Sequence, residues 1–154
     1  MTAQGALCKK LVDDESLVKA ELPSLLFLYE ALMQTDCSYL NFVLDDIRDK
    51  FGTMIAKGAT SLWETVHGAE AFSRAGSLCH AWSSVFNYVA GAYVLGVKPI
   101  EPGFKKFSFD PAVGYLSYFS GEVPTPYGPI EIEVDNSSVK MKNPQEICQG
   151  SSEN

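Results

Sequence analysis

The first two-thirds of the chain have apolar residues at the three- and four-residue spacing of amphipathic helices. One such run covers residues 22–35, and a second covers residues 38–56 and carries charged residues on its opposite face. The polar break Thr35-Asp36-Cys37-Ser38 separates the two runs, and Gly58 follows the second, as glycine commonly does just past a helix. This pattern predicts two helices joined as an αα-hairpin.

A third helix is predicted from about residue 77 to residue 96, after an irregular stretch at residues 58–76. Its C-terminal half is apolar nearly all round, which is typical of a helix covered on several sides. The two other helices cannot supply that cover alone. We therefore expect exposed apolar surface around Phe86, Tyr88 and Tyr93, with poor solubility or self-association as the consequence.

Beyond Gly96 the apolar period changes from helical to alternating. Residues 130–134 show this most clearly, because isoleucine and valine alternate there with glutamate, as in a strand with one face in water. We expect antiparallel strands between about residues 104 and 142, with a turn at residues 124–129. The polar end, Gln145 to Asn154, is expected to be frayed.

Runs of helices followed by runs of strands imply separate packing layers. The sequence therefore predicts an α-then-β chain, with a helical domain at residues 1–98 and the start of a β domain with a frayed tail at residues 99–154. Neither domain looks complete. A third helix so apolar needs further helices around it, and three or four short strands make half a sandwich.

Composition narrows the possible partners of this 154-residue chain. Its formal net charge of −7 would be repelled by nucleic-acid phosphates and by anionic membranes, so we expect neither as a partner. The first ten residues lack the apolar core of a signal peptide, which favours a cytoplasmic location. The four cysteines, at positions 8, 37, 79 and 148, are too widely spaced for a metal clip, so we expect free thiols, no metal and no cofactor.

Two segments contain residues suited to chemistry. Glu64 follows Trp63 in a glycine-bounded loop, where the carboxylate could act as a general base in a sugar pocket with an aromatic wall. The alternative is a surface glutamate beside a partly buried tryptophan. His80 lies at the predicted start of the third helix, and its alternative is a partly buried residue of a capped helix. These residues alone favour the structural alternative in both cases.

Four motifs that occur in a particular order favour the functional interpretation of Glu64 and His80 instead. They are Gly58-Ala59-Thr60-Ser61-Leu62-Trp63-Glu64, Ser77-Leu78-Cys79-His80-Ala81-Trp82-Ser83, Pro102-Gly103-Phe104-Lys105-Lys106-Phe107 and Pro124-Thr125-Pro126-Tyr127-Gly128. Together they resemble the end of the inverting bacterial α-L-rhamnosidases, from about Leu22 to Val134. The resemblance implies the last hairpins of a six-hairpin (α/α) barrel followed by part of an antiparallel C-terminal β-sandwich.

The resemblance also implies roles for individual residues. The family's Gly-Ala-Thr-x-x-Trp-Glu motif carries the general base, which matches Glu64, and its tryptophan matches Trp63. The histidine that the family places in its rhamnose pocket matches His80. The family's general acid lies far upstream and has no counterpart here. We therefore expect a C-terminal piece of a glycosidase, inactive as this chain alone, whose partners are a rhamnose-containing glycoside and the missing N-terminal part of the barrel.

Two other functions remain open from the sequence. The first is a non-catalytic remnant or carbohydrate-binding piece that keeps the pocket and turns nothing over. The second is a different glycosidase on the same (α/α) barrel, acting on unsaturated uronides or on glucose.

Overall fold

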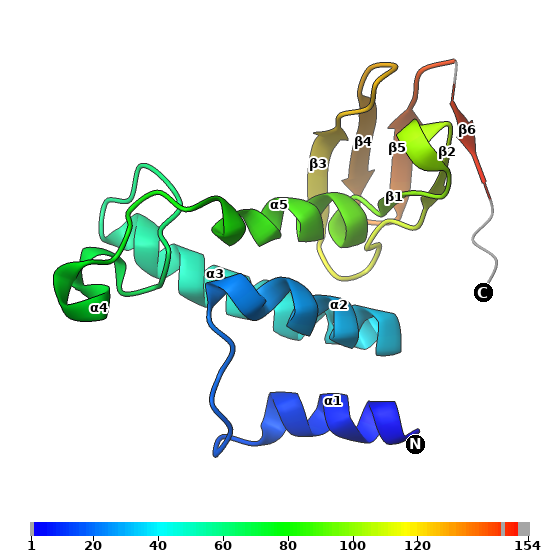
Figure 1. The fold of residues 1–154 in the computed structure, drawn as a ribbon. Helices are drawn as coiled ribbons and strands as arrows, with labels where there is room; N and C mark the ends of the chain where they lie inside the picture. Colours follow the sequence, from blue (N-terminus) through cyan, green and yellow to red (C-terminus); the bar gives the residue numbers. More distant parts are fainter. Residues whose placement is uncertain (1, 146, 151–154) are drawn as a thin grey trace. The chain divides into compact units, whose positions relative to one another are not determined.

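The computed structural model describes residues 2–145 and 147–150 (Figure 1). The chain divides into two compact units, Met1–Phe86 and Asn87–Asn154, which are described separately. The elements follow the predicted order of helices first and strands second. No helix in the described part of the chain is both long and apolar enough to cross a membrane.

The first unit contains the predicted hairpin. Helix α2 (Leu25–Thr35) follows a 3-10 turn at Leu22–Ser24, and helix α3 (Leu40–Ala56) follows another at Cys37–Tyr39. Asp36 lies between the two helices, and its side chain accepts a hydrogen bond from the backbone N–H of Ser38 at 2.8 Å. These bounds confirm the helices expected at residues 22–35 and 38–56.

Helix α1 (Ala3–Asp13) was not predicted from the sequence. Its N-terminus is capped by Thr2, whose hydroxyl accepts from the N–H of Gly5 at 3.1 Å. Cys8 is its one buried residue, and the thiol lies 3.4 Å from the hydroxyl of Thr35 on α2. The sequence of α1 is much less apolar on average than that of α2, so its periodicity was not recognised as that of a helix packed on a core.

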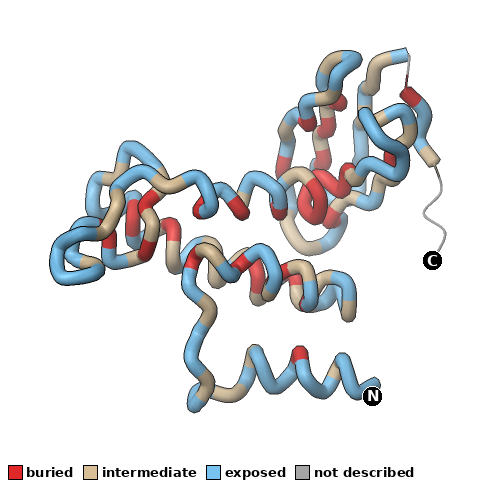
Figure 2. The backbone as a smooth tube through the Cα atoms, in the orientation of Figure 1, coloured by how far each residue is buried: buried red, intermediate tan, exposed pale blue. Residues whose placement is uncertain are grey.

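Buried positions recur along α2 and α3 and form the core of the first unit (Figure 2). Tyr29 is the largest of the fully buried side chains in this core. Its hydroxyl donates to Asp46 at 2.6 Å, and Asp46 also pairs with Lys50. Burial raises the pKa of the Tyr29 hydroxyl, and the hydrogen bond to Asp46 raises it further. The phenol is therefore held neutral well above the pH at which a free tyrosine ionises.

The third predicted helix begins later than expected. Residues 77–80 are not helical, and helical structure begins as a 3-10 turn at Ala81–Ser84 before α5 (Val85–Val89) and a π-helical turn at Ala90–Val94. The prediction of a helix from residue 77 was therefore wrong in its first turn. The physical reason is that the backbone of residues 77–80 bonds to an earlier loop instead.

The apolar surface expected near this helix is smaller than predicted. Phe86 packs edge-on against Phe51, with ring centroids 5.1 Å apart. Tyr93 is only 8% exposed, whereas Tyr88 is 44% exposed. Of the three aromatic residues, only Tyr88 clearly presents a large apolar surface.

The second unit contains two three-stranded sheets. The first has the order β1 (Val97–Pro99), β2 (Lys106–Phe109) and β6 (Cys148–Gln149). The second is an antiparallel meander of β3 (Tyr118–Val123), β4 (Ile130–Asp135) and β5 (Ser138–Lys142). The change of fold class predicted near residue 100 is confirmed, since the third helix ends at Val94, β1 begins at Val97, and only a short 3-10 turn at Pro102–Phe104 interrupts the strands that follow.

The end of the chain corrects one expectation. Cys148–Gln149 pair with β2 in parallel, and Ile147 is only 3% exposed, so residues 147–150 are not frayed as predicted. Residues 146 and 151–154, which belong to the same predicted tail, lie outside the described residues.

The meander shows the alternation that the sequence predicted. Ile130, Ile132 and Val134 are buried, whereas Glu131 and Glu133 face the other side and pair with Lys142 and Lys140 at 2.7 Å each. Gly121 on β3 packs closely against Leu95, since a Cβ there would lie 3.0 Å from the end of the leucine side chain.

The raised pKa of Tyr29 makes a prediction about stability at high pH. The folded protein keeps this phenol neutral, whereas the unfolded chain ionises it near pH 10, so stability is complete below pH ~10 and falls as the pH rises above it. The Tyr29→Phe variant should lose about 1 kcal/mol of stability at pH 7. Its unfolding free energy should also fall less steeply with pH above 10 than that of the unmodified chain.

Urea unfolding followed by circular dichroism at pH 7 and pH 10.5 measures both effects. The matched control is Tyr39→Phe, because no hydrogen bond of the Tyr39 hydroxyl is found within the described residues. Equal pH slopes for the unmodified chain and the Tyr29→Phe variant would contradict the assignment.

Candidate functional site

The loop after α3 is held against the segment that precedes the third helix. Gly58 ends α3 with a φ of +80°, a conformation that glycine adopts without strain. Two backbone hydrogen bonds then join the segments: Glu64 N–H donates to the Ser77 carbonyl at 2.9 Å, and His80 N–H donates to the Leu62 carbonyl at 2.7 Å. This pairing brings Glu64 and His80 together, although 16 positions separate them in the sequence.

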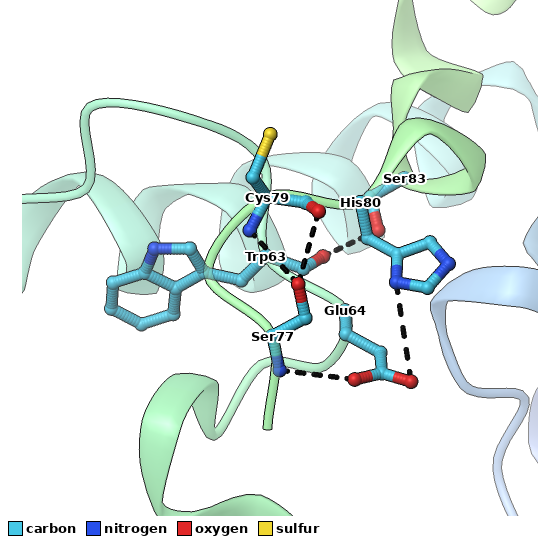
Figure 3. Close-up of polar contacts among 6 residues, drawn as sticks. All are labelled: Trp63, Glu64, Ser77, Cys79, His80 and Ser83. Atoms are coloured by element: carbon cyan, nitrogen blue, oxygen red, sulfur yellow. Dashed lines mark hydrogen bonds and ion pairs between the residues drawn. The ribbon is translucent and has the colours of Figure 1, made fainter. Parts of the chain in front are cut away.

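The Glu64 carboxylate lies between two different neighbours (Figure 3). Its Oε2 accepts a hydrogen bond from the Ser77 backbone N–H at 3.0 Å, and its Oε1 lies 4.0 Å from Nδ1 of His80. The side chains of Glu64 and His80 are 21% and 32% exposed. One oxygen is therefore fixed, while the other lies beyond direct hydrogen-bond length of the imidazole and remains accessible to a water or a hydroxyl.

The His80 ring is oriented by stacking. It lies on the indole of Trp82, with ring centroids 3.8 Å apart and planes inclined by 16°. Trp82 itself is 47% exposed. The stacking leaves the imidazole edge free to face the carboxylate, as Figure 3 shows for His80 and Glu64.

A pocket of about 350 Å³ opens beside this arrangement. Its lining residues are Glu21, Pro23, Glu64, Thr65, His67, Ala71, Phe72 and Trp82. The volume falls near the lower end of the range for small-molecule sites, roughly 300–1,000 Å³. The pocket combines two carboxylates with two aromatic rings, which suits a ligand that has both hydroxyl groups and an apolar face.

Trp63 does not line this pocket. It is only 8% exposed, and its carbonyl accepts a hydrogen bond from the buried Ser83 hydroxyl at 2.5 Å. Its indole lies so close to Gly68 that a Cβ there would come 2.6 Å from the ring. In Figure 3 the indole points away from the Glu64 carboxylate. Trp63 therefore supports the loop from beneath, and the aromatic ring at the pocket is Trp82.

The loop at one side of the pocket is strained. Phe72, Ser73 and Arg74 have φ angles of 51°, 60° and 73°, in the left-handed region. Each costs roughly 1–2 kcal/mol for a residue with a side chain. Phe72, which lines the pocket, is at the start of this run and is 64% exposed. Strain of this kind is concentrated at functional sites.

Of the eight residues that line the pocket, only Glu64 was proposed as a site residue from the sequence, and the acidic and aromatic residues Glu21, Phe72 and Trp82 were not identified. Trp82 carries a signal that could have found it, because it follows His80 by two positions in the same motif. Arg74 pairs with Glu70 at 3.5 Å and not with Glu64. Within the described ranges, no three His, Cys, Asp or Glu residues are arranged to hold a metal ion.

Comparison with known proteins gives one family match and similar solved structures. Residues 96–151 match the bacterial alpha-L-rhamnosidase C-terminal domain. The GH78 family rhamnosidase of Bacillus sp. GL1 superposes with a TM-score of 0.81 and 28% identity, over 94% of this chain and 16% of that one. No curated protein sequence matches the chain.

A second solved structure shows the same fold at lower identity. The alpha-L-rhamnosidase from Dictyoglumus thermophilum superposes with a TM-score of 0.71 and 21% identity, over 94% of this chain and 17% of that one. The chain thus spans about one sixth of the length of the solved structures that it matches.

Residues 96–151 thus match the C-terminal domain of the bacterial α-L-rhamnosidases, and the chain shares its fold with one segment of each of these two glycoside hydrolases. The resemblance to that family indicated by the four sequence motifs is confirmed.

The different places of the two tryptophans make a prediction about stability. Trp63→Ala should lower the unfolding free energy by about 3–5 kcal/mol, because it leaves a large cavity in the core. Trp82→Ala should lower it by less than ~1 kcal/mol, because its ring is half exposed. Chemical denaturation of each variant measures the difference. Equal losses for the two variants would show that Trp63 is not the buried support described here.

Proposed function

We propose that this chain forms the C-terminal part of an α-L-rhamnosidase that hydrolyses terminal α-L-rhamnose from glycosides with inversion. In this proposal the helical unit contributes the last hairpins of an (α/α)₆ barrel. The second unit contributes part of the C-terminal β-sandwich. Glu64 is the general base, and the substrate is a rhamnose-containing glycoside or oligosaccharide.

The observation that carries the proposal is the placing of the Glu64 carboxylate. It borders a pocket, is anchored on one side by the Ser77 N–H, and has its other oxygen toward His80. A general base must reach a water molecule, and a carboxylate locked in a short ion pair would be less able to do so. Among the described residues, no lysine or arginine forms an ion pair with Glu64.

An inverting glycosidase needs two carboxyl groups with different roles. One carboxyl group protonates the leaving oxygen, while the other takes a proton from the water that attacks the anomeric carbon from the opposite face. Glu64 performs the second task. His80 donates a hydrogen bond to a sugar hydroxyl, and the exposed indole of Trp82 stacks on the apolar face of the pyranose. The Trp63 ring acts only by supporting the loop that carries Glu64.

The first task needs a residue from outside this chain. No segment here matches the acidic motif that carries the family's general acid. Proton donation and water activation each contribute about 10²–10⁴-fold in rate, so one carboxylate alone gives turnover near background. The chain by itself should therefore bind the sugar without hydrolysing it. The proposed partner is the remainder of the barrel.

The second candidate function is that of a non-catalytic carbohydrate-binding piece, since such a piece would keep the same pocket.

The proposal predicts binding without turnover. The chain should bind L-rhamnose weakly, with a Kd on the order of 1–10 mM, as expected for a ligand of this size. Glu64→Gln should weaken that binding, because the amide replaces a charged acceptor by a neutral one. A nuclear magnetic resonance titration with L-rhamnose measures the affinity, and release of nitrophenol from 4-nitrophenyl α-L-rhamnoside measures turnover.

The control variant is Glu15→Gln, which changes an exposed glutamate outside the pocket. A chain that shows no rhamnose binding would refute the site. A pure monomeric preparation that hydrolyses the nitrophenyl rhamnoside, with the activity abolished by Glu64→Gln, would instead refute the requirement for a residue from elsewhere.

A further inference from the structure

The pocket beside Glu64 receives a second carboxylate from a distant segment. Glu21 lines it together with Glu64, although 43 positions separate the two residues in the sequence. The stretch before residue 22 shows none of the motifs on which the family resemblance rests. Glu21 therefore enters the site through the fold and not through a recognised motif.

The position of Glu21 is fixed by the residues that follow it. Leu22 is completely buried, and Pro23 restricts the backbone at the start of the 3-10 turn. Glu21 is extended there, and its carbonyl accepts a hydrogen bond from Ser24 N–H at 2.8 Å. This turn contacts the turn at Ala81–Ser84, which carries Trp82. Glu21 and Trp82 are thus held on neighbouring walls of one pocket.

The carboxylate of Glu21 has no structural partner within the described residues, where neither a hydrogen bond nor an ion pair to it is found. Glu21 is exposed, and the exposed Glu15 likewise has neither a hydrogen bond nor an ion pair within the described residues. Glu21 differs from it in position, because it lines the pocket together with Glu64 and Trp82.

We propose that Glu21 is a second sugar-contacting carboxylate of this pocket and makes it selective for neutral sugars over uronates. The proposal rests on the pocket being the sugar site proposed above. Sugar hydroxyls donate to carboxylates in charge-assisted hydrogen bonds, and two carboxylates on different walls hold hydroxyls on different parts of the ring. A uronate brings a third negative charge into the same space. Repulsion between like charges roughly 5 Å apart in water weakens binding by about fourfold.

The test compares two sugars on the full 154-residue chain. L-rhamnose and D-galacturonate are titrated separately, at pH 7 and low ionic strength, and affinities are obtained from chemical-shift changes. Glu21→Gln should weaken L-rhamnose binding by about tenfold, the effect of losing one charge-assisted hydrogen bond. The same variant should weaken D-galacturonate binding by only about two- to threefold, because the relief of the fourfold repulsion offsets part of the lost hydrogen bond. The ratio of the two affinities therefore falls by about fourfold.

Two matched variants separate the possible outcomes. Glu15→Gln removes the same charge outside the pocket and should leave both affinities unchanged. Glu64→Gln should weaken L-rhamnose binding, as the proposed function requires. If Glu64→Gln weakens binding and Glu21→Gln leaves both affinities unchanged, the role of Glu21 is refuted while the proposed function stands. If the unmodified chain binds no L-rhamnose, both are refuted. Tighter binding of D-galacturonate than of L-rhamnose by the unmodified chain refutes the selectivity.

Discussion

The candidate site depends on the pairing of two short non-helical segments, residues 62–64 and 77–80. Two backbone hydrogen bonds join them, and the Glu64 side chain adds a third by accepting from the Ser77 N–H. The same pairing sets the distance between the carboxylate and the imidazole. It also delays the start of the third helix to Ala81, because the Ser77 N–H and carbonyl and the His80 N–H already bond to the loop. The geometry of the Glu64–His80 site and the start of the third helix therefore both follow from this pairing.

Packing beneath the loop maintains this pairing. Trp63 fills the space under the loop, and Gly68 provides room for its ring. The Ser83 hydroxyl ties the Trp63 carbonyl to the first turn after His80. The side chain of Trp63 therefore faces the core, whereas the side chain of the next residue, Glu64, faces the pocket. A rigid support of this kind suits a site whose reacting groups must keep a fixed geometry.

Local periodicity was enough to predict α2, α3 and the β3–β5 meander, because each buries one regular face. It failed where pairing between distant residues decides the structure. The short strands β1 and β6 acquire order only by pairing with β2, and residues 77–80 only by pairing with the loop. The motifs predicted that Glu64 and His80 belong to one site. The motifs could not reveal that the tryptophan lining the pocket is Trp82, or that Glu21, which precedes α2, also lines it.

The central claim is that Glu64 serves as the base of an α-L-rhamnosidase, and a chimaeric enzyme tests it most directly. The matching segment of the Bacillus sp. GL1 rhamnosidase is replaced by this chain, and kcat/KM is measured on 4-nitrophenyl α-L-rhamnoside for chimaeras with glutamate or glutamine at position 64. The account predicts hydrolysis by the first and a loss of about 10²–10⁴-fold in the second. A folded, active chimaera whose rate is the same with either residue would contradict it.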